Sequence, residues 1–188
     1  MALIHGGDTE GYILEYGRPP LDFSANCNPL GVPPGVARAI AEAAPSADKY
    51  PDPLCRRLRS ALGEKLGLPP EYVLCGNGAA DIIFRLALAL RPRRALVTAP
   101  TFAEYALALG TVGCEVIHHR LPPERGFTVE EDILEKIPGA DIVFICNPNN
   151  PTGKTVSPAL MEKILHACGK SGALLVVDEC FNGFLDDP

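Results

Sequence analysis

Short apolar runs alternate with segments of helical periodicity along most of this chain, and this alternation narrows the possible folds. Apolar runs of strand length lie at residues 72–75, 94–98, 115–118, 142–146 and 173–177. Apolar residues recur at helical spacing in the segments between them, at residues 79–90, 103–112, 129–136 and 158–168. Strands separated by helices pair in parallel and are covered on both faces. The sequence therefore predicts an α/β fold, a three-layer αβα sandwich around a mainly parallel sheet, with ligands at the carboxyl ends of the strands.

The N-terminal part of the chain has a different pattern. It is rich in Gly, Pro, Asn and Asp, which predicts a loop-rich arm. A first helix is expected with Pro33 and Pro34 in its first turn and with Pro45 as its end. A second helix is expected with Asp52 as its N-cap and Pro53 as its first residue. We expect residues 1–48 to form an N-terminal arm and helix, and residues 49–188 to form the first part of a ligand-binding domain.

Composition argues against two large classes of partner. A formal net charge of -6 is opposite to the basic face that nucleic-acid binding requires. The longest apolar runs, such as Ala173–Val177, are far shorter than the roughly 20 residues that cross a bilayer, so no membrane span is expected. The N-terminus lacks the basic and apolar regions of a secretory signal, which predicts a cytoplasmic protein. The cysteines show no CxxC spacing, so no metal is expected and the partner should be a small molecule.

Polar residues follow three of the predicted strands, where ligands are expected. Gly76–Asp81 opens into a helix, and its glycines and free N–H groups suit a phosphate, although such a turn is more often only a tight connection. Asn147–Gly153 contains two prolines and a glycine that can fix one amide in a set direction; a rigid turn is the alternative. Asp178 ends a buried apolar strand, where an acid needs a cationic or hydrogen-bonding partner unless it caps the next segment.

A phosphate cradle, a fixed asparagine and a buried acid, in this order on successive strands, resemble the three polar handles that class I/II aminotransferases offer to pyridoxal 5'-phosphate. The resemblance extends over the whole chain, and Asn147–Gly153 is its most specific motif. It implies the large domain of a fold-type I pyridoxal-phosphate enzyme. The family's Schiff-base lysine and its small C-terminal domain are expected beyond Pro188, so the chain by itself is expected to be inactive.

The resemblance also implies a role for individual residues. Asp178 corresponds to the partner of the pyridine nitrogen, and its negative charge keeps that nitrogen protonated. Asn150 corresponds to the donor to the phenolic oxygen and also faces the substrate. Phe102 corresponds to the aromatic that stacks on the ring, although a core aromatic is the alternative. Tyr50 corresponds to a tyrosine that reaches the cofactor phosphate of the other subunit, which implies a homodimer. The backbone N–H groups that correspond to the phosphate ligands are those of Gly78, Ala79 and Ala80.

Two features bear on the position of the chain within the family. The N-terminal string resembles the arm with which threonine-phosphate decarboxylases of cobalamin synthesis hold a phosphorylated substrate, and His5, Gly6 and Asn26 are the matching positions. Phe181 stands where the aminotransferases usually carry a tyrosine, and phenylalanine cannot donate a hydrogen bond. We therefore expect decarboxylation of L-threonine O-3-phosphate to aminopropanol phosphate. A histidinol-phosphate or related aminotransferase is the alternative within the family, and a non-catalytic module that binds a phosphorylated metabolite is the alternative outside it.

Overall fold

The computed structural model of the chain describes residues 6–186, which are divided into two compact units, with the boundary along the chain between Val73 and Leu74. The expected boundary between residues 48 and 49 concerns the organisation of a longer domain and stays a prediction. Each unit is described by itself below.

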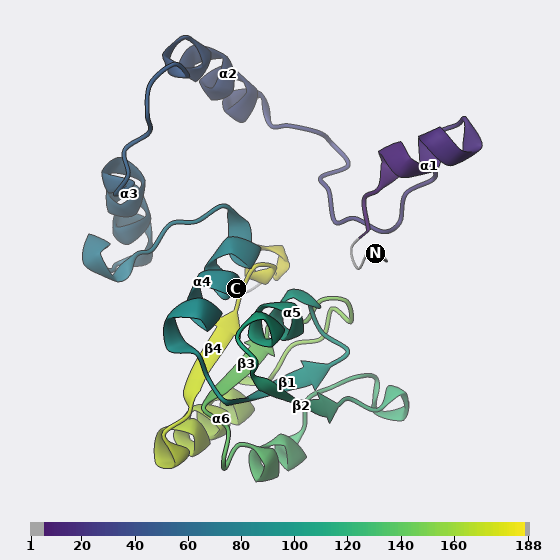
Figure 1. Cartoon of the computed structure of the whole chain (residues 1–188), viewed down its shortest axis with the longest axis vertical. Helices are drawn as coiled ribbons and strands as arrows, with labels where there is room; N and C mark the ends of the chain where they lie inside the picture. Colours follow the sequence, from purple (N-terminus) through teal and green to yellow (C-terminus); the bar gives the residue numbers. More distant parts are fainter. Residues whose placement is uncertain (1–5, 187–188) are drawn as a thin grey trace. The chain divides into compact units, whose positions relative to one another are not determined.

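The C-terminal unit is built on a four-stranded sheet in which every neighbouring pair is parallel. The strands are β1 (Arg94–Ala99), β2 (Glu115–Arg120), β3 (Ile142–Cys146) and β4 (Leu174–Asp178), in the order β2-β1-β3-β4 (Figure 1). Strand β3 is buried along its whole length, because helices cover both faces of the sheet. The α/β class and the parallel sheet are thus confirmed.

Helices pack on both faces of this sheet and make the three expected layers. Side chains of α4 (Gly78–Leu90) and α5 (Glu104–Thr111) form one buried cluster with Ala95 and Val97 of β1. Leu96, the residue between them, points to the other face, where it packs with α6 (Pro158–Ser171) and the 3-10 helix η4 (Glu131–Lys136). Side chains of alternate strand residues therefore point into two separate hydrophobic cores, one on each face of the sheet. Two shorter 3-10 helices of this unit are η3 (Pro123–Arg125) and η5 (Asn182–Phe184).

Two expectations about secondary structure are wrong. Residues 72–75 do not form a strand: the 3-10 helix η2 (Pro70–Tyr72) ends there, and the backbone of Val73 is extended. An apolar run becomes a strand only when a neighbour accepts its hydrogen bonds, and no strand of the described chain lies beside it. Residues 129–136 were expected to be an α-helix but form the tighter η4, which still buries Ile133.

The N-terminal unit contains three α-helices, α1 (Thr9–Tyr16), α2 (Pro34–Ala43) and α3 (Arg56–Leu66), with the 3-10 helix η1 (Ala44–Ser46) after α2. The loop-rich arm predicted from composition therefore contains a helix that was missed. Its signals are local: the Asp8 side chain accepts a hydrogen bond from Gly11 N, and Gly17 ends the helix in the left-handed conformation.

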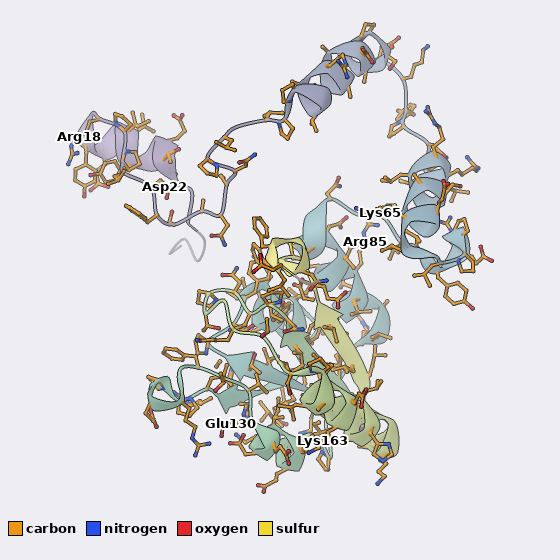
Figure 2. All side chains as sticks on the ribbon, turned by 180° about the vertical axis from the view of Figure 1, so that it is seen from behind. Arg18, Asp22, Lys65, Arg85, Glu130 and Lys163 are labelled. Atoms are coloured by element: carbon orange, nitrogen blue, oxygen red, sulfur yellow. The ribbon has the colours of Figure 1, made fainter. Side chains whose placement is uncertain are left out.

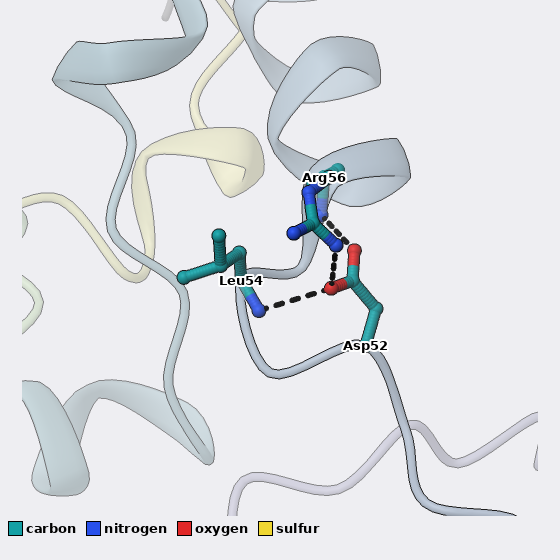
Figure 3. A network of polar contacts seen from close by, with 3 residues as sticks. All are labelled: Asp52, Leu54 and Arg56. Atoms are coloured by element: carbon teal, nitrogen blue, oxygen red, sulfur yellow. Dashed lines mark hydrogen bonds and ion pairs between the residues drawn. The ribbon is translucent and has the colours of Figure 1, made fainter.

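The expectation that Asp52 is the N-cap of α3 is wrong: the helix begins at Arg56 and its N-cap residue is Cys55, although Asp52 accepts a hydrogen bond from the first helical N–H. Its carboxylate accepts hydrogen bonds from the backbone N–H of Leu54 at 3.1 Å and of Arg56 at 2.8 Å, and it pairs with the Arg56 guanidinium at 2.6 Å (Figure 3). These bonds, that from Arg56 N first, lower the pKa of Asp52. Pro53 therefore lies in a turn before the helix. Within residues 6–186 no helix has the length and apolar character needed to span a membrane.

Candidate functional site

Several polar segments share one edge of the C-terminal unit. The loops after β1, β3 and β4 leave the sheet at the carboxyl ends of parallel strands, hence on the same edge. Helix α4 directly precedes β1 and packs along the sheet, so its N-terminus faces this edge too (Figure 1). The chain passes from β1 outward to β2 and then returns to β3 on the other side of β1. The loops after β1 and β3 consequently diverge, which is where open α/β sheets bind ligands.

The N-terminus of α4 is able to bind an anion. Asn77 is the N-cap residue, yet its side chain makes no capping hydrogen bond, and the N–H groups of Gly78, Ala79 and Ala80 have no acceptor in the described chain. Gly78 has φ 78°, and a Cβ there would meet nothing within 4 Å, so the approach to these N–H groups is open. The free N–H groups and the helix dipole together favour a phosphate at this point.

An acid in the first turn of this helix, Asp81, is already engaged by partners within the protein. Asp81 accepts a hydrogen bond from Asn77 N at 2.9 Å and pairs with Arg85 at 2.9 Å, one turn further along α4. Figure 2 shows Arg85 on the surface of this helix. Because Asp81 is already paired with a cation, its charge does not oppose an anion at the N–H groups.

The loop after β3 contains three asparagines. In the described part of the chain, the side chains of two of them are hydrogen-bonded within the protein, and that of the third is not. Asn147 Oδ1 accepts a hydrogen bond from Val156 N at 2.8 Å. The Asn149 side chain is buried and fully hydrogen-bonded within the protein. The carboxamide of Asn150, by contrast, has no hydrogen-bond partner among residues 6–186 and is partly exposed. Asn150 is therefore the amide of this loop that is free to bind a ligand.

Asp178 lies half-buried at the end of β4 and is oriented by a tyrosine. Its Oδ2 accepts a hydrogen bond from the Tyr105 hydroxyl at 2.7 Å, and its Oδ1 accepts one from Cys180 N at 3.0 Å. Tyr105, on α5, is completely buried and stacks on Phe144 with ring centroids 5.0 Å apart. Burial and then the bond to Asp178 raise the pKa of Tyr105 above its ordinary value. The hydroxyl therefore stays protonated and donates a hydrogen bond to the carboxylate.

Tyr105 was not selected from the sequence. Its partner Asp178 is 73 residues away, so no local pattern connects them. One signal was present: Tyr105 follows Phe102 at a spacing that places both on one side of a helical turn. Their rings do meet edge to face, with centroids 5.7 Å apart. Phe102, the expected stacking residue, is therefore in contact with the tyrosine that holds Asp178.

Besides Asn150, the residues expected to contact the substrate belong to the N-terminal unit. His5 lies outside the described residues. Gly6 packs so closely on Ser24 that a Cβ at Gly6 would lie 2.2 Å from the Ser24 carbonyl oxygen, and Gly7 N donates to Ser24 Oγ at 2.8 Å. The start of the arm thus lies next to the string that contains Asn26, whose side chain is exposed.

Two further expectations concern Tyr50 and Phe181. Tyr50 is fully exposed, and Phe181 is partly buried beside Phe184, with ring centroids 6.1 Å apart. Lys163 lies on the surface of α6, on the same side as the segment of Glu130, and pairs with Glu131 at 2.5 Å (Figure 2). In the described part of the chain no three His, Cys, Asp or Glu side chains gather in a way that could hold a metal ion.

Comparison with known proteins identifies close sequence relatives. The family model for aminotransferase class I and II matches residues 18–188. Threonine-phosphate decarboxylase of Salmonella typhimurium is 38% identical over 96% of this chain and 51% of its own length. Histidinol-phosphate aminotransferase 1 of Cupriavidus pinatubonensis is 38% identical over 88% of this chain and 44% of its own length. The chain thus spans about half the length of the curated relatives it matches.

Solved structures agree with the fold. The crystal structure of histidinol-phosphate aminotransferase from Clostridium acetobutylicum matches with a TM-score of 0.79 and 32% identity, covering 90% of this chain and 50% of that one. The Sinorhizobium meliloti histidinol-phosphate aminotransferase in complex with pyridoxal-5'-phosphate matches with a TM-score of 0.80 and 24% identity, over 95% and 49% of the two chains, which is a likeness of fold.

Proposed function

Because this chain belongs to the class I and II aminotransferases, a family of pyridoxal-phosphate-dependent enzymes, we propose that it is the cofactor-binding part of a decarboxylase. The proposed substrate is L-threonine O-3-phosphate and the product is aminopropanol phosphate, as a step of cobalamin biosynthesis. The whole activity requires the Schiff-base lysine and the carboxylate-binding arginines that the family resemblance places after residue 188.

The polar groups at the sheet edge fit the proposed cofactor in number and in kind. Bound pyridoxal phosphate supplies an electron sink for the electrons released at the substrate Cα. Asp178 would hold the proton on the pyridine nitrogen, because a carboxylate raises the pKa of a cation beside it. Tyr105 would keep that carboxylate in a fixed orientation through the 2.7 Å hydrogen bond. The available carboxamide of Asn150 would donate to the phenolic oxygen.

In this proposal, other groups at the sheet edge and Tyr50 bind the phosphate and the face of the cofactor ring. The free N–H groups of Gly78, Ala79 and Ala80 would bind its phosphate. Phe102, already in edge contact with Tyr105, would stack on the ring. The exposed Tyr50 would reach the phosphate bound by a second subunit, which makes the proposed enzyme a homodimer; a cytoplasmic location belongs to the same proposal.

The structure of the N-terminal arm is the observation on which we base the choice of decarboxylation over amino transfer. The bond that breaks at Cα is the one aligned with the π-system of the cofactor, so the reaction type depends on how the substrate is gripped. Gly6 and Gly7 pack on Ser24, two residues before Asn26, which gathers the segments proposed to grip the substrate phosphate. A second relative, from Caldanaerobacter subterraneus, is named a putative threonine-phosphate decarboxylase and is 36% identical over 97% of this chain, a range that includes part of the arm.

A histidinol-phosphate aminotransferase is the second candidate. The observation in its favour is the Clostridium acetobutylicum structure, which is similar in both sequence and backbone. The handles for the cofactor are the same in both candidates, so they differ only in how substrate is held. Membership of an enzyme family speaks against the non-catalytic binding module.

The test is an assay of the full-length protein with pyridoxal phosphate added. We expect threonine phosphate to release carbon dioxide and aminopropanol phosphate, and histidinol phosphate with an oxo-acid acceptor to give little turnover. Amino transfer from histidinol phosphate without decarboxylation of threonine phosphate would establish the second candidate instead. A full-length protein that develops no visible absorption band with the cofactor would contradict both enzymes and support the binding module.

A further inference from the structure

Asn149 is one of the few buried polar residues of the described chain, and each of its side-chain polar atoms is hydrogen-bonded. It is 5% exposed. Its Oδ1 accepts a hydrogen bond from the Thr101 hydroxyl at 2.8 Å, and its Nδ2 donates to the Pro100 carbonyl at 3.0 Å and to Thr152 Oγ1 at 2.8 Å. A buried amide with all its partners satisfied holds the groups around it in one arrangement.

These bonds join two loops that the sheet itself does not hold together. The β1–β3 ladder ends at the pair Val97–Phe144, before either loop begins. Beyond that pair the chain diverges, because β1 continues to β2 and β3 continues to α6. Asn149 bridges this divergence. Two of its three partners belong to the loop after β1.

Each of the joined loops carries a residue proposed to contact the cofactor. Phe102 directly follows Thr101, and Asn150 directly follows Asn149. The backbone of Asn149 is fixed as well: its N–H donates to the Lys154 carbonyl at 2.8 Å, and its carbonyl accepts from Gly153 N at 2.7 Å. A displacement of the Asn149 side chain would therefore change the spacing between Phe102 and the Asn150 carboxamide.

We propose that Asn149 is a positioning residue that sets the distance between Phe102 and Asn150. It would thereby fix the position of the cofactor ring between these two side chains. The inference rests on the proposed function. Only an amide meets the requirement, because the position needs one acceptor toward Thr101 and two donors toward Pro100 and Thr152. Aspartate lacks the donors, and leucine lacks both kinds of group.

The experiment uses the full-length protein and compares Asn149→Ala and Thr101→Val with a conservative variant, Thr101→Ser, that keeps the hydroxyl. The control is Ser157→Ala, which removes the N-cap of α6 at the far end of the loop after β3; the Ser157 side chain bonds to Leu160 N and not to Asn149, Thr101 or Pro100. Four quantities are measured: the melting temperature, the dissociation constant for pyridoxal phosphate, kcat, and the pH midpoint of the visible band of the bound cofactor.

We expect Asn149→Ala and Thr101→Val to weaken cofactor binding about tenfold or more and to lower kcat by up to about a hundredfold, since misplacement by about 1 Å has effects of that size. The pH midpoint should rise, because a displaced Asn150 no longer stabilises the deprotonated phenolic oxygen. Thr101→Ser should give wild-type values in all four measurements. Ser157→Ala should lower the melting temperature alone. Thr101→Val keeps the side-chain volume, so it remains informative if Asn149→Ala fails to fold.

Two outcomes would contradict the inference, and they can be told apart. Asn149→Ala and Thr101→Val proteins that bind the cofactor with the wild-type constant and midpoint, while melting earlier as Ser157→Ala does, would reduce Asn149 to a structural residue and overturn the inference alone. A wild-type protein that binds no cofactor would overturn the proposed function and the inference with it.

Discussion

The hydrogen bond from Tyr105 to Asp178 should contribute measurably to the stability of the C-terminal unit. Tyr105→Phe removes only the hydroxyl and leaves the ring that stacks on Phe144. Hydrogen bonds to charged groups contribute about 1.5–3 kcal/mol, but half-buried Asp178 can recover part of this from water. We therefore expect Tyr105→Phe to lower the free energy of unfolding by about 1–2 kcal/mol at pH 7.

The same substitution should also change how the free energy of unfolding depends on pH. Burial and the bond to Asp178 raise the pKa of Tyr105 above its ordinary value of 10.0, so folding favours the protonated hydroxyl. As the pH rises above 10, the unfolded chain loses this proton while the folded chain keeps it, and the stability that the protonated hydroxyl provides declines. Tyr105→Phe cannot lose that proton. The difference in stability between the two proteins should thus shrink above pH 10.

Urea unfolding of the 188-residue chain, followed by circular dichroism between pH 7 and 11, measures both effects. Tyr72→Phe is the matched control, because Tyr72 is 78% exposed, and its unfolding free energy should stay within about 0.5 kcal/mol of wild type. Equal unfolding free energies for wild type and Tyr105→Phe at pH 7, with the same decline above pH 10, would refute the reasoning.

Three further substitutions test the proposed site in the full-length protein. Asp178→Ala should lower turnover by several orders of magnitude while cofactor still binds, because the phosphate contacts supply much of the affinity but not the electron sink; rate and dissociation constant measured together check this, and near-normal turnover would contradict the role. Phe181→Tyr should lower the pH midpoint of the visible band without changing the reaction type, since a new donor stabilises the deprotonated phenolic oxygen; an unchanged titration would mean that Phe181 does not face the cofactor. Gly6→Ala should raise KM for threonine phosphate more than it changes cofactor binding, because its Cβ would collide with Ser24 and disturb the arm; a KM equal to that of wild type would separate the arm from substrate binding.

The two central strands, β1 and β3, could be predicted from the sequence because they are buried along most or all of their length. Runs such as Ile142–Cys146 are apolar throughout, and no exposed position interrupts them. The apolar run at residues 72–75 gave the same signal but has no neighbouring strand. Sequence periodicity reports that a segment is apolar, whereas a strand also needs a partner, which lies elsewhere in the chain.

The candidate site was predicted as far as its residues lie in local motifs. The turn at Gly78 that we propose to bind phosphate, the Asn147–Gly153 string and Asp178 all lie at the predicted sheet edge. The roles of Tyr105 and Asn149 could not be predicted, because each depends on a hydrogen bond between residues about 50 or more positions apart. Pairs of that kind follow from the order of strands in the sheet, which the sequence pattern leaves open.

Strand β4 forms an edge of the sheet in the described chain, with β3 as its one partner. Its sequence, Leu174–Val177 followed by Asp178, is apolar up to the last residue, and Pro or Lys is absent from it. Such an edge offers a row of unpaired backbone groups to another chain, and natural proteins normally block it with a charge, a proline or a cover. In preparations of this chain alone, aggregation through β4 would then compete with folding, and a lysine introduced in place of Leu174, which is 45% exposed, is the simplest way to suppress it.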